Sequence, residues 1–167
     1  MRDPIEQRVV DHLEALEASS ELVEIDPSLA DTASFCEHYG YPLDVSANAI
    51  LVASRRPAGV HAVGVVLATN RLDVNKTLCR LMGVKRASFA PADLTRELTG
   101  MEIGGVTPFG LPKPLTIYVD AAIVALDRAV VGGGTRSMKI DLDPEVFTRR
   151  PGVEVIEGLA NPIVASG

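Results

Sequence analysis

Two long apolar runs near the middle of the chain place the strongest limit on its fold. Residues 45–54 and 61–69 are rich in Val, Ile, Leu and Ala, and residues 55–59 between them read Arg-Arg-Pro-Ala-Gly. Runs of this length that are bounded by turn residues are typical of β-strands. The chain therefore needs a central sheet, and other segments must cover its apolar faces.

Helical and extended patterns alternate along the rest of the chain without a steady βαβ rhythm. The spacing of apolar and turn residues predicts helices over 3–18, 29–39, 72–82 and 91–98. Further strands are predicted over 21–25, 85–89, 115–119, 129–131, 137–142 and 153–156. We expect a mixed α/β (α+β) fold in a single domain, 1–167, whose residues 151–167 form a frayed tail with the one strand at 153–156.

Composition excludes several classes of protein. Of the 167 residues 47% are hydrophobic and 23% are charged, as in an ordinary soluble protein with a core. Two cysteines are too few for a disulfide scaffold and fit a reduced compartment. The longest mostly apolar stretch, 58–68, is too short to span a membrane, and no signal peptide is visible, so we expect a cytoplasmic protein. An aromatic content of 4% argues against a stacking platform for single-stranded nucleic acid.

Charge is distributed unevenly along the chain. Residues 1–44 hold eleven acids and two bases, a balance of −9, and the other 123 residues balance at +3, which together give the net −6. Residues 71–96 carry six bases against two acids. Such a run is either a solvated helix face, which charge alone favours, or a local patch that faces phosphates.

The common catalytic and metal-binding motifs are missing from the sequence. The three histidines and two cysteines have no recognised zinc spacing, and there is no G-x-S-x-G. The triplet 132–134 is followed by Thr135 and lacks the Lys-Ser/Thr ending of a P-loop. We therefore expect no metal and no cofactor.

A glycine-rich loop is the strongest remaining candidate for a functional site. Residues 104–110 read Gly-Gly-Val-Thr-Pro-Phe-Gly, and Pro108 and Pro112 stiffen the backbone. Glycine lets a backbone approach a ligand closely and present its N–H groups to an oxyanion or phosphate. A tight structural turn explains the same residues equally well, so the loop alone leaves both interpretations open.

An ordered series of segments resembles the YbaK/ProX family of aminoacyl-tRNA deacylases, which are related to the editing domain inserted in bacterial prolyl-tRNA synthetases. The loop 104–110 looks like the family's signature loop. Similar family segments, in the same order and within about residues 30–150, are found at 72–76, 81–85, 99–100, 117–120, 131–136 and 140–142.

The resemblance implies a curved, barrel-like mixed sheet flanked by helices, with a pocket for the 3′ end of an aminoacyl-tRNA. It implies hydrolysis of the ester of a mischarged tRNA, with help from the ribose hydroxyl and with neither metal nor covalent intermediate. The implied partners are tRNA and a synthetase, and neither a membrane nor DNA. The implied catalytic residues are Asn48, Gly104 and Gly105. The implied substrate-binding residues are Val106, Thr107, Pro108, Phe109, Gly110, Asp120, Gly133, Gly134 and Arg136.

One departure from the family pattern changes the chemistry of the implied pocket. The family carries a lysine where this chain has Asn48. Asparagine offers two N–H donors and a dipole but no charge. The chain is then either a deacylase in which another cation (Arg136, Lys139 or Lys76) covers the phosphate, or an impaired module that binds tRNA or a synthetase. A third alternative is an unrelated ligand in the same fold.

Overall fold

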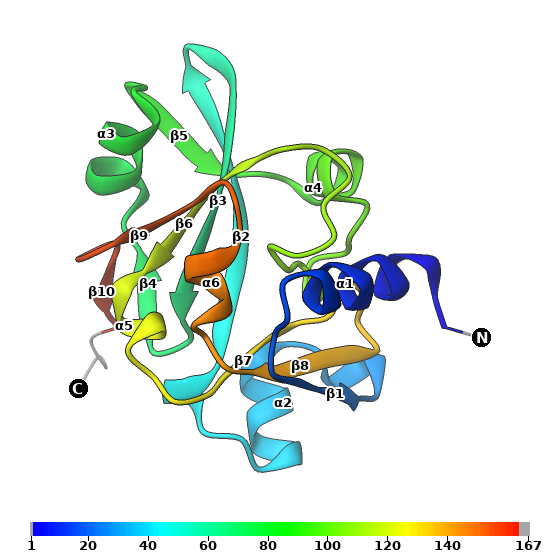
Figure 1. Ribbon diagram of the computed structural model, residues 1–167. Coiled ribbons are helices and arrows are strands. Elements are labelled where there is room, and N and C mark those ends of the chain that lie inside the picture. Colours follow the sequence, from blue (N-terminus) through cyan, green and yellow to red (C-terminus); the bar gives the residue numbers. More distant parts are fainter. Residues whose placement is uncertain (1, 164–167) are drawn as a thin grey trace.

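The computed structural model describes residues 2–163, and its largest sheet is built on the predicted central hairpin (Figure 1). The strand order in this sheet is β5-β2-β3-β6-β9. The strands are β2 (Ala47–Arg56), β3 (Ala58–Leu67), β5 (Arg86–Phe89), β6 (Thr116–Asp120) and β9 (Val153–Ile156). β6 runs parallel to both of its neighbours, whereas β2 is antiparallel to β3 and β5, so the sheet is mixed.

Two smaller sheets complete the β-structure of residues 2–163. One has the order β1-β8-β7, with β1 (Ser20–Glu24), β7 (Ala129–Gly132) and β8 (Met138–Leu142). The other pairs β4 (Asn70–Leu72) with β10 (Ala160–Pro162). A parallel bridge between Ser46 and Val130 connects the start of β2 to β7. The mixed α/β class is confirmed, but the described strands form open sheets and not the expected barrel.

Helices lie around these sheets, and α1 bears most directly on the site. The helices are α1 (Pro4–Ala15), α2 (Thr32–Tyr39), α3 (Cys79–Met82), α4 (Ala92–Thr99), α5 (Ala121–Val124) and α6 (Val146–Arg149). The Asp3 carboxylate caps α1 by accepting from the Ile5 N–H at 2.7 Å. α1 buries Val9, Val10 and Leu13 and lies beside the loop that follows α4 (Figure 1).

Three predicted segments differ from the structure. The helix expected over 29–39 is split into a 3-10 turn, Pro27–Leu29, and α2, because Asp31 adopts an extended backbone before α2. The segment expected as one helix over 72–82 is a π-helical turn, Val74–Leu78, followed by α3. The strand predicted over 153–156 is present as β9, but the expected frayed tail also contains a second strand, β10, and residues 164–167 lie outside the described part.

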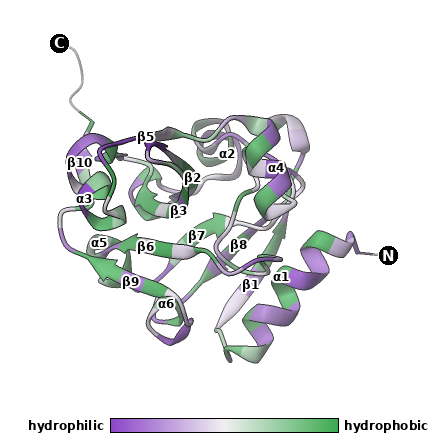
Figure 2. Cartoon of the chain, turned by 90° about the horizontal axis from the view of Figure 1, so that it is seen from above, coloured by the Kyte–Doolittle hydropathy of each residue, from purple (hydrophilic) through white to green (hydrophobic). Residues whose placement is uncertain are grey.

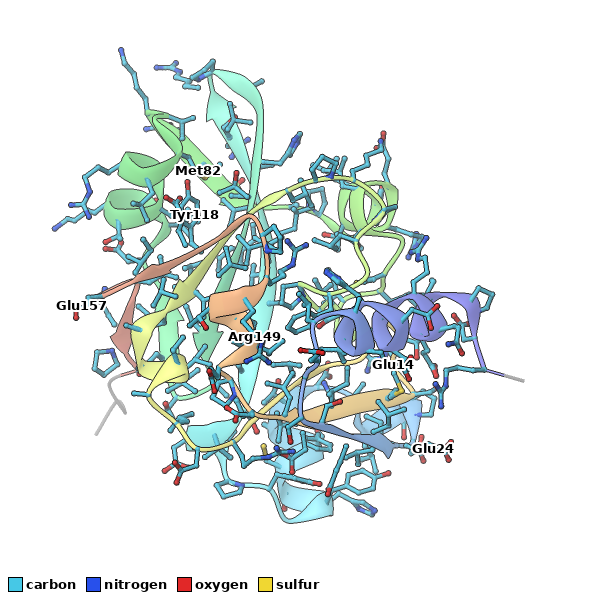
Figure 3. All side chains as sticks on the ribbon, viewed as in Figure 1. Glu14, Glu24, Met82, Tyr118, Arg149 and Glu157 are labelled. Carbon is cyan, nitrogen blue, oxygen red and sulfur yellow. The ribbon has the colours of Figure 1, made fainter. Side chains whose placement is uncertain are left out.

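The main hydrophobic core joins the inner face of α1, the large sheet and the β7–β8 pair. Figure 2 shows hydrophobic residues concentrated along β6 and β7. Phe109 and Phe147 meet in this core with ring centroids 5.5 Å apart. A second cluster covers the opposite face of the sheet, where Tyr118 points toward α3 near Met82 and donates its hydroxyl to the Leu81 carbonyl at 3.2 Å (Figure 3). Hydrophobic clusters therefore cover both faces of the sheet, and their packing fixes the position of β2.

Candidate functional site

Two adjoining cavities lie between β2, the loop after α4 and the β7–β8 hairpin. The smaller cavity measures about 40 Å³, and the six residues that matter most on its walls are Thr32, Asn48, Gly104, Val106, Gly132 and Lys139. The larger measures about 210 Å³ and adds Ile50, Leu51, Phe89, Ala90, Thr95 and Ile103. Ala49, Gly104 and Val106 line both cavities. A polar recess therefore opens beside an apolar one.

Asn48 presents hydrogen-bond donors to the small cavity. The Thr32 hydroxyl at the start of α2 donates to Asn48 Oδ1 at 2.5 Å. Because this bond occupies the amide oxygen, the amide orientation leaves Nδ2 to donate. No acceptor for Nδ2 is found among residues 2–163. The two N–H groups of Asn48 are thus available to a ligand.

Gly104 shapes the part of the loop that faces the cavities. Its φ of +98° is one that L side chains rarely adopt, and a Cβ at this position would overlap the Arg136 guanidinium. The hydrogen bonds of the described chain give no acceptor to the N–H groups of Gly104 and Val106. Both residues line the small cavity. These two N–H groups fit the interpretation of the loop as a donor for an oxyanion.

Close packing explains other glycines of the loop and hairpin. A Cβ on Gly105 would overlap the Thr135 carbonyl, and a Cβ on Gly132 would lie 2.5 Å from the Val106 carbonyl oxygen. The Gly134 N–H donates to the Gly105 carbonyl at 2.7 Å. These contacts hold the loop against the β7–β8 hairpin. The interpretation as a structural turn therefore applies to Gly105, while Gly104 borders the cavity.

Lys139 brings a buried amine to the polar recess. It lies on β8 opposite Gly132 of β7, and only 6% of the residue is exposed. Its Nζ donates to the Gly104 carbonyl at 3.0 Å and lies 5.6 Å from the centroid of the Phe35 ring. Burial and, to a smaller degree, the nearby Arg136 charge lower the pKa of Lys139 to about 8. The pKa of this amine is thus close to neutral pH.

Arg136 serves as a bridge beneath the loop. Its Nη1 donates to the Ile103 carbonyl at 2.9 Å, and its Nε donates to the Pro27 carbonyl at 3.2 Å. Nη1 also lies 3.5 Å from Asp31 Oδ1. These three bonds tie the loop to the segment before α2. In the same hairpin, Gly133 packs against Met138 and Gly134 packs against Ile5 of α1.

The second half of the glycine loop is anchored away from the cavities. The Gly110 N–H donates to His12 Nδ1 at 2.9 Å, and the Pro108 carbonyl accepts from Arg150 Nε at 2.9 Å. Phe109 is fully buried in the core. Thr107 is also fully buried, and its hydroxyl has no hydrogen-bond partner within the described part of the chain. These residues fix the loop, and Gly104 and Val106 carry its donors to the cavities.

Asp120 is distant in role from the other predicted residues. It ends β6, and its carboxylate caps α5 by accepting from the Ala122 N–H at 3.0 Å. It lines neither cavity. A carboxylate in the same position is explained by helix capping.

The described range, residues 2–163, also bears on metal binding, membrane crossing and other depressions. No three His, Cys, Asp or Glu side chains of this range are grouped so as to hold a metal ion, and no helix there is both long and apolar enough to cross a membrane. A larger depression of about 700 Å³ near the N-terminus is lined by Arg2, Asp3, Glu6, Leu22, Glu24 and Met138. Three carboxylates on its wall make it unsuitable for a phosphate.

Sequence reasoning missed Thr32 and the apolar cavity, and it assigned Lys139 only to phosphate. Phe89 and Ile103 are each 54% exposed beside that cavity. Exposed large side chains lining a recess indicate a contact surface. The sequence places these two residues 14 positions apart in unrelated segments, so only the fold brings them together.

Comparisons with known proteins place this arrangement among relatives. Residues 26–149 match the family model described as "Aminoacyl-tRNA editing domain". "Uncharacterized protein YwhH" of Bacillus subtilis (strain 168) is 28% identical over 134 residues, covering 80% of this chain and 83% of its own. Proline–tRNA ligase of Brachyspira hyodysenteriae (strain ATCC 49526 / WA1) is 33% identical over 63 residues, 37% of this chain and 11% of the ligase.

A solved structure shares the fold along nearly the whole chain. It is a crystal structure of a proposed trans-editing enzyme for prolyl tRNA synthetase, with a TM-score of 0.79 and 24% identity. The match covers 98% of this chain and 100% of the other. At this identity the likeness establishes the fold and leaves the activity to the residues of the site.

Proposed function

The chain belongs to the aminoacyl-tRNA editing domain family, and we propose that it hydrolyses in trans the ester of a mischarged tRNA. The observation that carries the proposal is a polar recess lined by Asn48, Gly104 and Val106, whose Nδ2 and backbone N–H groups have no acceptor among the described residues. An aminoacyl ester is already activated. Positioned donors that stabilise the developing oxyanion are therefore sufficient chemistry for attack by water.

The size of the recess supports a small reacting group. A cavity of about 40 Å³ has room for roughly three water molecules. It therefore admits the ester carbonyl and the attacking water, and it excludes a nucleotide base. The reacting ester enters this recess, and the adenosine stays outside it.

The apolar cavity is suited to the terminal adenosine. It adjoins the recess through Ala49, Gly104 and Val106, and Phe89 and Ile103 are exposed on its wall. A base has an apolar face that stacks on an aromatic ring, with a contribution of about 1–3 kcal/mol. The ester joins the adenosine to the amino acid, so two adjoining cavities of these characters match the two parts of the substrate.

The first experiment is hydrolysis of a panel of mischarged tRNAs by the wild-type protein, Asn48→Ala and Phe89→Ala. We expect turnover of at least one ester and a loss of about 10²-fold in kcat for Asn48→Ala, since a pocket donor disappears. Phe89→Ala should mainly raise KM, by about fivefold or more, because base stacking is removed.

Other outcomes of the same panel decide between the alternatives. Absence of turnover with every ester, together with measurable tRNA binding, would favour the impaired binding module that Asn48 suggests. Equal rates for wild type and Asn48→Ala would remove Asn48 from the mechanism. An unchanged KM in Phe89→Ala would contradict the adenosine site.

A further inference from the structure

Lys139 carries a charge that packing does not explain. Its side chain is buried between β7, the glycine loop and Phe35, and its Nζ donates to one carbonyl, that of Gly104. None of the ion pairs found among residues 2–163 includes it. Burial of an ammonium without a carboxylate partner is unfavourable, and Met or Leu would fill the same space without that cost.

The N–H groups of Lys139 that have no acceptor among residues 2–163 are at the wall of the recess, where a ligand can accept from them. An ammonium has three N–H donors, and the Gly104 carbonyl accepts one of them. Lys139 lines the same 40 Å³ recess as Asn48 and Thr32. The other two cations that the sequence offers for the phosphate are placed differently. Arg136 is bonded to Ile103 and Pro27, and Lys76 lies exposed on the π-helical turn.

We propose that Lys139 is the catalytic cation of this site, whose ammonium donates a hydrogen bond to the ester carbonyl oxygen as negative charge develops on it. The inference rests on the proposed deacylase function. In the reaction, a water oxygen forms a bond to the carbonyl carbon, and the bond from that carbon to the ribose oxygen breaks. One proton of the water passes to the ribose oxygen, and Lys139 keeps its own protons.

Charge on the donor determines how the reaction should depend on pH. Since the pKa of Lys139 is lowered to about 8, the ammonium predominates at neutral pH and is lost as pH rises through that value. The charged groups that face it are Arg136 on the hairpin and Asp31 before α2, and the Cys36 thiol faces it from α2 itself. Arg136 favours the neutral amine, while Asp31 and Cys36 favour the ammonium. A charge-assisted donor is about twice as strong as a neutral one.

The test uses the full chain and the ester that the wild-type protein hydrolyses. Lys139→Met and Lys139→Gln remove the charge, Lys139→Arg keeps a charge that does not titrate, and Lys113→Met is the matched change at an exposed lysine. The ratio of kcat/KM to spontaneous ester hydrolysis is measured from about pH 6.5 to 9.5, a range that brackets the amine. Thermal melting of each variant and its tRNA affinity are measured in parallel.

The expected result is a loss of about 10²–10³-fold in kcat for Lys139→Met and Lys139→Gln, with tRNA affinity unchanged and Lys113→Met equal to wild type. In wild type the ratio should fall above about pH 8, and that fall should be absent in Lys139→Arg. If a neutral variant does not fold, the comparison of wild type with Lys139→Arg still decides. Full activity in a folded neutral variant, or identical pH profiles for wild type and an active Lys139→Arg, would overturn the inference. Failure of wild type on every ester would instead reject the proposed function.

Discussion

At the residue scale, charge repulsion limits the small recess to one ammonium. Asn48 and Lys139 both line about 40 Å³, and two unit charges about 4 Å apart repel by roughly 4 kcal/mol at an effective dielectric constant near 20. We expect Asn48→Lys to lower kcat/KM by about tenfold or more, since each 1.4 kcal/mol is a factor of ten. The double variant Asn48→Lys/Lys139→Met should recover activity relative to Lys139→Met, because a single ammonium again occupies the recess.

The measurement for this pair is a double-mutant cycle in kcat/KM, with Asn48→Ala/Lys139→Met as the control that carries no ammonium. If the double variant Asn48→Lys/Lys139→Met loses less activity than the sum of the two single losses, the two lysines compete for one position. Additive losses in the cycle would contradict a shared recess.

Residue-scale prediction from the sequence reached Asn48, Gly104 and Val106 as neighbours but not Lys139 as part of the same recess. The pattern of β8 explains the omission. Met138, Lys139 and Ile140 are all buried, so alternation along this strand does not reveal which side faces a ligand. The side that Lys139 faces depends on the pairing of β8 with β7 and on the loop packed against that pair, and both contacts are distant in the sequence.

At the scale of elements, one histidine of α1, His12, joins this helix to the glycine loop. His12 Nδ1 accepts from the Gly110 N–H, and its ring packs edge-on against Phe109 with centroids 5.9 Å apart. Burial, and then the Arg150 charge, lower the pKa of His12 below its ordinary 6.5. Because the pKa of His12 is lower in the folded state than in the unfolded state, neutral His12 contributes to the free energy of unfolding. This contribution is fully present above about pH 6.5 and is lost as pH falls below that value.

We therefore expect the melting temperature of wild type to fall as pH is lowered from about 7 toward 5, and His12→Ala to lose that part of the pH dependence. The variant should be less stable by about 1 kcal/mol at pH 7.5, because the Gly110 N–H is left without an acceptor. Asp26 and Asp73 do not interfere, because hydrogen bonds from Ser28 and Thr77 lower the pKa of these two carboxyl groups, which keeps them ionised over this range. His38→Ala, at an exposed histidine, is the control. If the melting temperatures of wild type and His12→Ala fall equally as pH is lowered across this range, the mechanism is contradicted.

Element prediction succeeded where the signal is local. The central hairpin and the end of α4 at Gly100, whose φ is +74°, follow from short sequence patterns. β9 pairs in parallel with β6, about 37 positions earlier in the chain, and β10 pairs with β4. Strands of three or four residues stabilised by distant partners leave little signal of their own. For this reason the sequence predicts β9 but not its pairing with β6, and it gives a frayed tail where the structure also has β10 paired with β4.

At the scale of the whole molecule, a basic tip extends from the site on an acidic protein. We define the basic tip as Arg55, Arg56, Lys85 and Arg86, all exposed where β2 turns into β3 and β5 begins. Side chains that end in nitrogen gather at this end of the molecule (Figure 3). Arg56 and Arg86 are direct partners across the strands, and no ion pair among residues 2–163 involves the tip. Like charges placed opposite each other are unfavourable unless a polyanion binds them.

Geometry connects the basic tip to the apolar cavity. Arg86 and Phe89 are the two ends of β5, so about 10 Å of extended chain separates them. If the terminal adenosine stacks on Phe89, the phosphates of the preceding nucleotides pass along β5 toward the tip. The net charge of −6 prevents broad coating of nucleic acid, so a local patch must supply most of the attraction.

The prediction is that the basic tip sets the salt dependence of tRNA binding. Changing its four bases to Gln should weaken binding. It should also make the slope of log affinity against log salt shallower by about 0.7–0.9 for each phosphate that the tip no longer neutralises, which is a total change in slope of roughly three. Arg86→Gln should free about one phosphate, whereas Lys113→Gln removes the same charge elsewhere and should leave the slope unchanged. Binding is measured by titration at several salt concentrations, and kcat at saturating tRNA should stay near that of wild type because the recess is intact. A wild-type slope in the quadruple variant would show that the acceptor end reaches Phe89 by another face of the molecule.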